Sequence, residues 1–81
     1  MAKGQRNLPS AQQLMQRWGL TQKEAEFTVL FLQGLDISEC AKQLTMTSET
    51  GRWYCKRVME KLGVNRQAEL AIKLLMEFFP E

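Results

Sequence analysis

Apolar residues recur every three or four positions in five stretches of this chain, and residues that start or end helices separate the stretches. Side chains at this spacing lie on one face of a helix, so each stretch can bury one side. No stretch alternates apolar and polar residues, as a half-buried strand does. The pattern therefore predicts an all-α domain over residues 10–79, after a flexible polar tail over residues 1–9. The expected helices span about 11–18, 22–33, 37–44, 48–62 and 66–79.

Capping residues mark the starts of four of these helices. In a capping box, the side chains of a Ser, Thr or Asp and of a Glu or Gln three positions later each accept a hydrogen bond from the other's backbone N–H. Three pairs have this spacing: Ser10 with Gln13, Thr21 with Glu24, and Asp36 with Glu39. Thr47 is the expected N-cap of the helix over residues 48–62.

The third and fourth expected helices, joined by a short turn at Thr45 and Met46, predict a helix-turn-helix. Ala41 supplies the small side chain that such a unit needs where its two helices cross closely. The second helix of this motif can lie in the major groove of DNA. From Lys42 to Arg66, basic residues outnumber acidic ones, with Lys42, Arg52, Lys56, Arg57, Lys61 and Arg66 against Glu49 and Glu60. This charge is typical of a phosphate-binding face, although a solvated helix face has the same composition.

The last expected helix carries two apolar stripes. Leu70, Leu74 and Phe78 make one, and Ile72, Met76 and Phe79 make the other. A helix of a small domain cannot bury two faces against its own core, so the pattern predicts a homodimer through this helix. The alternative is that the N-terminal helix covers the second stripe. The expected dimer-interface residues are Leu70, Ile72, Leu74, Met76 and Phe79.

Composition narrows the class of protein. The chain of 81 residues has a net charge of +2 and contains no His. Its two cysteines, Cys40 and Cys55, do not make a metal-ligand cluster, and Cys40 is expected to be a small buried hydrophobe in a reduced, cytoplasmic protein. No apolar run is long enough to span a bilayer, and no Gly-rich phosphate loop or nucleophile–base pair is present. We therefore expect no metal, no cofactor, no membrane association and no enzymatic activity.

From Leu20 to about Phe78, the chain resembles the LuxR/GerE-type helix-turn-helix family of bacterial transcription factors. The segments that carry the resemblance are LTQKEAEFTVLFLQG, SECAKQLTMTSET and KLGV, whose matching residues are Leu20, Thr21, Glu24, Glu26, Leu30, Gly34, Glu39, Ala41, Leu44, Met46, Thr47, Thr50, Lys61, Leu62 and Val64. The resemblance implies a four-helix domain whose third helix enters the major groove and whose fourth forms a two-fold dimer contact. This chain adds one short helix, within residues 10–18, before that domain.

The resemblance also assigns roles to residues of the helix over 48–62. Arg52 and Lys56 are expected to point at base edges, with Trp53 between them. Thr50 and Lys61 match positions that usually touch phosphates, and Thr47 matches a capping residue that can also face the DNA backbone. The full set of expected phosphate contacts is Thr47, Ser48, Thr50, Arg57 and Lys61.

Three positions depart from the family pattern. Gly51 stands where the family usually has Val; it either leaves a gap that Tyr54 fills or permits a close helix crossing. Arg66 arrives one residue before the family's usual Arg. Trp53 and Tyr54 place large aromatics in mid-helix, where Trp53 either contacts DNA or packs on a neighbouring helix.

The favoured hypothesis is a homodimeric, sequence-specific DNA-binding transcriptional regulator that lacks a receiver or ligand-binding domain. The alternative is a helix-turn-helix interaction module that binds another regulator or RNA polymerase. A promoter-reading fragment like part of a sigma factor is a variant of the first hypothesis. In either case, the N-terminal helix can complete the core, extend the dimer or dock a protein partner.

Overall fold

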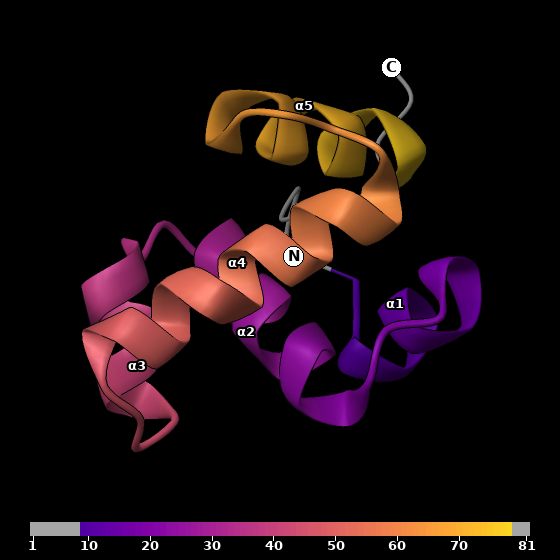
Figure 1. The fold of residues 1–81 in the computed structure, drawn as a ribbon. Helices are drawn as coiled ribbons and strands as arrows, with labels where there is room; N and C mark the ends of the chain where they lie inside the picture. The colour runs from indigo at the N-terminus through magenta and orange to yellow at the C-terminus, as the bar shows by residue number, and fades with distance from the viewer. Residues whose placement is uncertain (1–8, 79–81) are drawn as a thin grey trace, which may run out of the picture.

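The protein folds as five α-helices in the computed structural model, which describes residues 9–78, with side chains as far as Glu77 (Figure 1). The helices are α1 (Ala11–Trp18), α2 (Gln22–Leu32), α3 (Ile37–Gln43), α4 (Ser48–Leu62) and α5 (Gln67–Phe78). The all-α fold class is confirmed, and each helix begins and ends at the expected residue or one residue away. The expected tail, residues 1–9, lies outside the described residues except for Pro9, whose side chain is buried.

The three expected capping boxes are present. In α2, the backbone N–H of Thr21 donates to Glu24 Oε1 over 2.9 Å, and that of Glu24 donates to Thr21 Oγ1 over 3.2 Å. Thr47 caps α4 by accepting a hydrogen bond from the N–H of Thr50 over 3.1 Å. The boxes of α1 and α3 join Ser10 with Gln13 and Asp36 with Glu39. Each box satisfies two N–H groups that have no partner within the helix.

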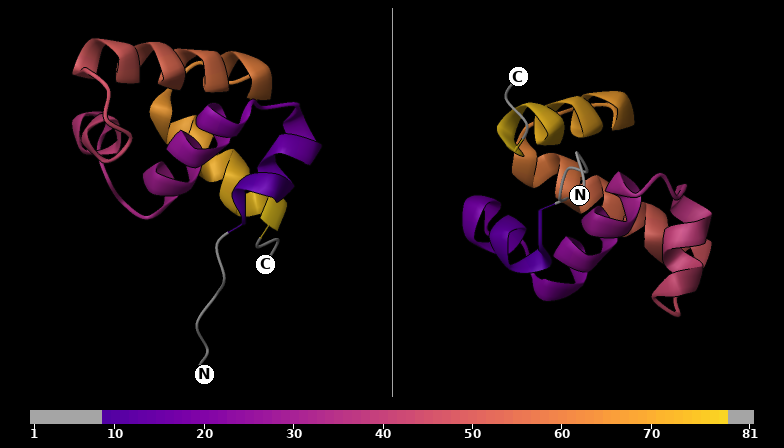
Figure 2. Two further views of the ribbon diagram at one scale, coloured as in Figure 1. Left: turned by 90° about the horizontal axis from the view of Figure 1, so that it is seen from below. Right: turned by 180° about the vertical axis from the view of Figure 1, so that it is seen from behind.

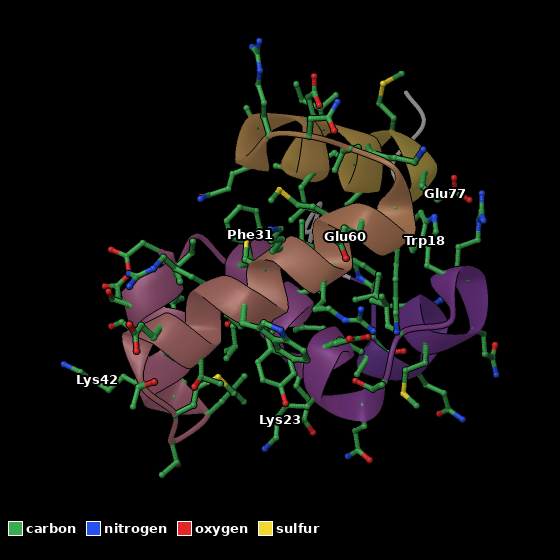
Figure 3. All side chains as sticks on the ribbon, viewed as in Figure 1. Trp18, Lys23, Phe31, Lys42, Glu60 and Glu77 are labelled. Atoms are coloured by element: carbon green, nitrogen blue, oxygen red, sulfur yellow. The ribbon has the colours of Figure 1, made fainter. Side chains whose placement is uncertain are left out.

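Two neighbouring apolar clusters form the core, and α2 contributes to both. Figure 2 shows α2 in the middle of the bundle. Phe31 of α2, which Figure 3 labels, packs against both clusters. The second cluster lies between α2 and the helix-turn-helix and is built on Phe27, Cys40 and Cys55. The first cluster joins α1, α2, α4 and α5 through Leu14, Leu20, Ala25, Val58, Leu62, Leu70 and Leu74. The extra helix α1 is therefore part of the core.

The cysteines are free thiols, and both are buried in the second cluster. Burial, together with the nearby Asp36 carboxylate, raises the pKa of the Cys40 thiol to about 11. Cys55 occupies an inward position of α4, whereas Tyr54 beside it is half-buried. The inward face of α4 therefore runs through Gly51, Cys55, Val58 and Leu62.

Gly51 lies where α4 crosses α3. A Cβ atom at this position would lie 2.9 Å from Ala41 Cβ and 3.3 Å from Ile37 Cγ2, which is closer than side-chain carbons normally approach. The glycine therefore permits a close helix crossing. The expectation that Gly51 leaves a gap for Tyr54 is wrong, because Ala41 and Ile37 already occupy that space.

The two stripes of α5 have different surroundings. Leu70 and Leu74 are each 1% exposed and pack with Leu14 in the first cluster, so their assignment to a dimer interface is wrong. This stripe faces the core, and the second one is open to solvent, with Ile72 55% and Met76 68% exposed. The alternative in which the N-terminal helix covers the second stripe is therefore also wrong. Phe79 lies outside the described residues.

Candidate nucleic-acid interface

The turn between α3 and α4 is fixed by backbone hydrogen bonds. The N–H groups of Thr45 and Met46 donate to the carbonyls of Lys42, over 3.2 Å, and Ala41, over 2.9 Å. Thr45 has a φ of 60°, a left-handed conformation that few residues other than glycine adopt. These bonds end α3 and lead the chain into α4, which gives the expected helix-turn-helix.

The outer surface of α4 carries the residues expected to read bases. Arg52, Trp53 and Lys56 are exposed, while Gly51, Cys55, Val58 and Leu62 hold the opposite side in the core. We call Arg52, Trp53 and Lys56 the reading face. Within residues 9–78, neither Arg52 nor Lys56 forms an ion pair, so both charges are free to meet an external anion.

Trp53 is 53% exposed and contacts residues of its own helix. Its ring centroid lies 5.0 Å from that of Tyr54, with the two rings nearly perpendicular at 89°. The guanidinium carbon of Arg57 lies 5.5 Å from the centroid of the Trp53 ring. Trp53 therefore does not pack on a neighbouring helix as the alternative expected, because over half of it faces solvent and its ring contacts are with α4 itself.

A buried carboxylate ties α4 to the start of α2. Glu24 is 2% exposed, and its Oε1 accepts a hydrogen bond of 2.7 Å from Lys61 Nζ, which also donates to the Gly19 carbonyl over 3.2 Å. Arg57 Nε lies 3.8 Å from Glu24 Oε2. We call Glu24, Lys61 and Arg57 the Glu24 clamp. The sequence identified Glu24 as a capping residue and as a match to the family pattern, but not its contact with Lys61, which lies far away in the chain.

The clamp lowers the pKa of the Glu24 carboxyl and pairs the charge of Lys61 within the protein. Burial disfavours the ionised form of Glu24, but hydrogen bonds from Lys61 and from the backbone of Thr21 outweigh it, so the pKa of this carboxyl lies below its usual value. The ammonium group of Lys61 is thereby paired with a carboxylate of its own chain. This geometry gives Lys61 a structural role inside the protein, and its expected phosphate contact stays a prediction.

Arg57 is shared between three groups. Besides Glu24 and Trp53, its Nη1 lies 3.9 Å from Glu60 Oε1, one turn along α4. Figure 3 labels Glu60 on α4. Arg57 is nonetheless close to half exposed, so its guanidinium can also reach a phosphate.

The remaining expected phosphate contacts gather at the N-terminus of α4. Thr47, Ser48 and Thr50 are exposed, with Thr47 Oγ1 3.0 Å from Thr50 Oγ1 and Ser48 Oγ 3.3 Å from Ser38 Oγ. Backbone N–H groups and the helix dipole favour an anion at such an end. Ser38 of α3, which was not among the expected residues, belongs to this group of hydroxyls.

A family model describing bacterial regulatory proteins of the luxR family, GerE, matches residues 19–74, which run from the start of the α2 capping segment into α5. The chain belongs to the LuxR family. This membership makes it a DNA-binding transcription regulator of the helix-turn-helix class, and regulators of this family are generally not enzymes. The matched residues leave α1 outside. No curated protein and no solved structure shows a significant match to the chain.

Across residues 9–78, no group of His, Cys, Asp and Glu side chains is placed to bind a metal ion. Over the same residues, each helix is too short or too polar to span a membrane.

Proposed function

We propose that this LuxR-family chain binds double-stranded DNA sequence-specifically as a homodimer, with α4 in the major groove. The observation that carries the proposal is the pair of exposed cations, Arg52 and Lys56, one turn apart on the reading face and unpaired within the described residues. Arg52 is suited to guanine, because its guanidinium can donate two hydrogen bonds to O6 and N7. Lys56 can donate to the next bases along the groove.

Phosphate contacts would position α4 on the duplex. The hydroxyls of Thr47, Ser48 and Thr50 surround the N-terminus of α4, and Arg57 stands farther along the helix. Such contacts supply most of the affinity without carrying sequence information. Because Lys61 is held by Glu24, we expect it to contribute through the position of α4.

The dimer contact would form through the outer stripe of α5, which consists of Ile72, Leu75 and Met76. Their side chains are 55%, 45% and 68% exposed, and grouped apolar exposure of this kind marks an interaction surface. A second copy of the same chain buries the stripe most simply, by a two-fold contact. Two α4 helices would then read half-sites about one helical turn apart on cytoplasmic DNA.

The alternative function is a protein-interaction module, and one observation favours it. Glu49 and Glu60 are exposed on α4 together with Trp53, so the surface of this helix is less basic than that of a purely electrostatic DNA binder. A regulator or RNA polymerase would then occupy this surface. The extra helix α1, which lies outside the family match, is a second place where a protein partner could dock.

Binding to duplex DNA separates the two functions. We expect selection from a random duplex pool to return a preferred sequence, and affinity for it to fall steeply with salt. Arg52→Ala should cost about 1–3 kcal/mol on the preferred site and much less on random duplex, because it removes base contacts. Ser48→Ala is the comparison: its hydroxyl is expected to contact phosphate, so its loss should weaken both duplexes about equally and leave the salt slope unchanged, because no charge is removed. A chain that binds no duplex even at low salt would favour the interaction module.

A further inference from the structure

Trp53 lies in the middle of the exposed surface of α4. It is a large apolar side chain among charged and polar ones. Successive residues of a helix are rotated by about 100°. This rotation places the indole ring between Arg52 and Lys56 on one side and Thr50 and Arg57 on the other. Polar and charged groups that can meet phosphates and base acceptors therefore flank one large apolar group. Whatever α4 binds must present an apolar group to Trp53 and anionic groups around it.

The indole ring is also held in place before any ligand arrives. The Arg57 guanidinium lies over the ring at 5.5 Å, and Tyr54 meets it at 5.0 Å in a perpendicular arrangement. Arg57 is itself restrained by Glu24 at 3.8 Å and Glu60 at 3.9 Å. A side chain ordered in this way loses little rotamer freedom on binding, so a small contact with it can still be selective.

The major groove of DNA offers one apolar group that fits this arrangement. The edges of the base pairs present hydrogen-bond donors and acceptors, and the 5-methyl group of thymine is their one apolar feature. We propose that Trp53 makes the reading face selective for a thymine in each half-site, through contact between the indole ring and the 5-methyl group. This inference rests on the proposed DNA-binding function, and it names the base that one residue of the reading face recognises.

Deoxyuridine provides the direct test, because it pairs like thymine and lacks the methyl group. The full chain is measured by fluorescence anisotropy on the selected duplex and on duplexes in which each thymine in turn is replaced by deoxyuridine. Burying a methyl-sized group is worth about 0.8 kcal/mol, which corresponds to about a four-fold change in affinity. We expect this loss at one thymine of each half-site and almost no loss at the others. In a duplex with a C·G pair at that position, replacing the cytosine by 5-methylcytosine should raise the affinity by a similar factor, because it restores the methyl group.

Protein variants tie the effect to Trp53. Trp53→Ala should bind the thymine and deoxyuridine duplexes equally, with an unchanged salt slope, because no charge is removed. Trp53→Phe should retain part of the discrimination. Tyr54→Phe, which keeps the neighbouring ring, is the matched control and should behave like the wild type. Thermal melting checks that Trp53→Ala is folded, which its exposed position leads us to expect.

A uniform response to deoxyuridine in the wild type would overturn the inference and leave the DNA-binding function intact. The same profile in the wild type and in Trp53→Ala would also overturn it, since another residue would then sense the methyl group. Equal weakening of Trp53→Ala on specific and random duplexes would show a contact without base preference and would overturn it too. A random pool that returns no preferred sequence contradicts the proposed function itself, and the thymine contact fails with it.

Discussion

Gly51 shows how a single hydrogen atom in place of a methyl group sets the spacing of the helix-turn-helix. Alanine is the better helix former by about 1 kcal/mol, so helix propensity alone predicts that Gly51→Ala stabilises the fold. The added Cβ would lie 2.9 Å from Ala41 Cβ, between two backbones that are already packed. The steric effect opposes the propensity effect and is the larger of the two, because overpacking a rigid crossing typically costs about 1–3 kcal/mol.

We therefore expect Gly51→Ala to lower the free energy of unfolding by up to about 2 kcal/mol in urea denaturation. Ala41→Gly in the same chain removes the atom that the new methyl group meets, so the double variant should be more stable than the sum of the two changes predicts. An increase in stability for Gly51→Ala alone would contradict the close crossing.

Glu24 is the residue that links stability to pH. The pKa of its carboxyl lies below the ordinary value of 4.5, since hydrogen bonds from Lys61 and Thr21 outweigh the effect of burial. A group whose pKa is depressed in the folded state stabilises that state fully above its unfolded pKa, and this contribution is lost as the pH falls through the folded pKa. The Glu24 clamp should therefore weaken below about pH 4.5.

Glu24→Gln tests this directly. The amide oxygen can still accept from Thr21, but the ion pair with Lys61 is lost, so we expect a loss of about 1–3 kcal/mol at neutral pH. The difference from the wild type should shrink as the pH falls from 5 to 3, because the wild-type carboxyl becomes protonated. Glu26→Gln, a half-buried neighbour on the same helix, is the control. A difference between wild type and Glu24→Gln that is constant across this pH range would contradict the clamp.

At the scale of helices, substitutions on the two faces of α5 should affect stability in different ways. Leu74 is 1% exposed, so Leu74→Asp should bury a charge in the first cluster and unfold the chain. Ile72→Asp changes the outer stripe, where the side chain is 55% exposed, and should leave the melting temperature close to that of the wild type. If the outer stripe forms the dimer, Ile72→Asp should shift sedimentation toward the monomer and raise the dimer dissociation constant at least ten-fold. A wild type that remains monomeric at high concentration would contradict the dimer.

The same helices show what local sequence can predict and what it cannot. Helix ends depend on residues three positions apart, which is why Thr21 with Glu24 could be identified before the structure. The partner of Glu24 in α4 lies 37 residues away, and no local pattern specifies that pairing. Spacing likewise gave α5 two apolar stripes, but which of them faces the core depends on where α1 packs. The roles of Arg52, Trp53 and Lys56 follow from their place on α4 and remain predictions about DNA.

At the scale of the whole molecule, α1 belongs to the core although it lies outside the family match. Leu14 is fully buried in the first cluster, which joins α1, α2, α4 and α5, so removing most of its side chain leaves a cavity in the core. We expect Leu14→Ala to lower the free energy of unfolding by about 2–5 kcal/mol in denaturant titration. Gln12→Ala, at an exposed position of the same helix, should have little effect. Equal stability of the two variants would show that α1 is dispensable for the core.

The close crossing at Gly51 also limits how recognition can be exchanged between relatives. A chain of this family with the usual Val at this position needs more space between the two helices than Ala41 and Ile37 leave here. Its α4 must then sit farther from α3, or at another angle, and its outward side chains approach the groove along a different line. Grafting Arg52, Trp53 and Lys56 onto such a relative would therefore transfer the base-reading side chains without the helix crossing that orients them. A successful transplant of sequence preference should have to carry Gly51 and Ala41 as well.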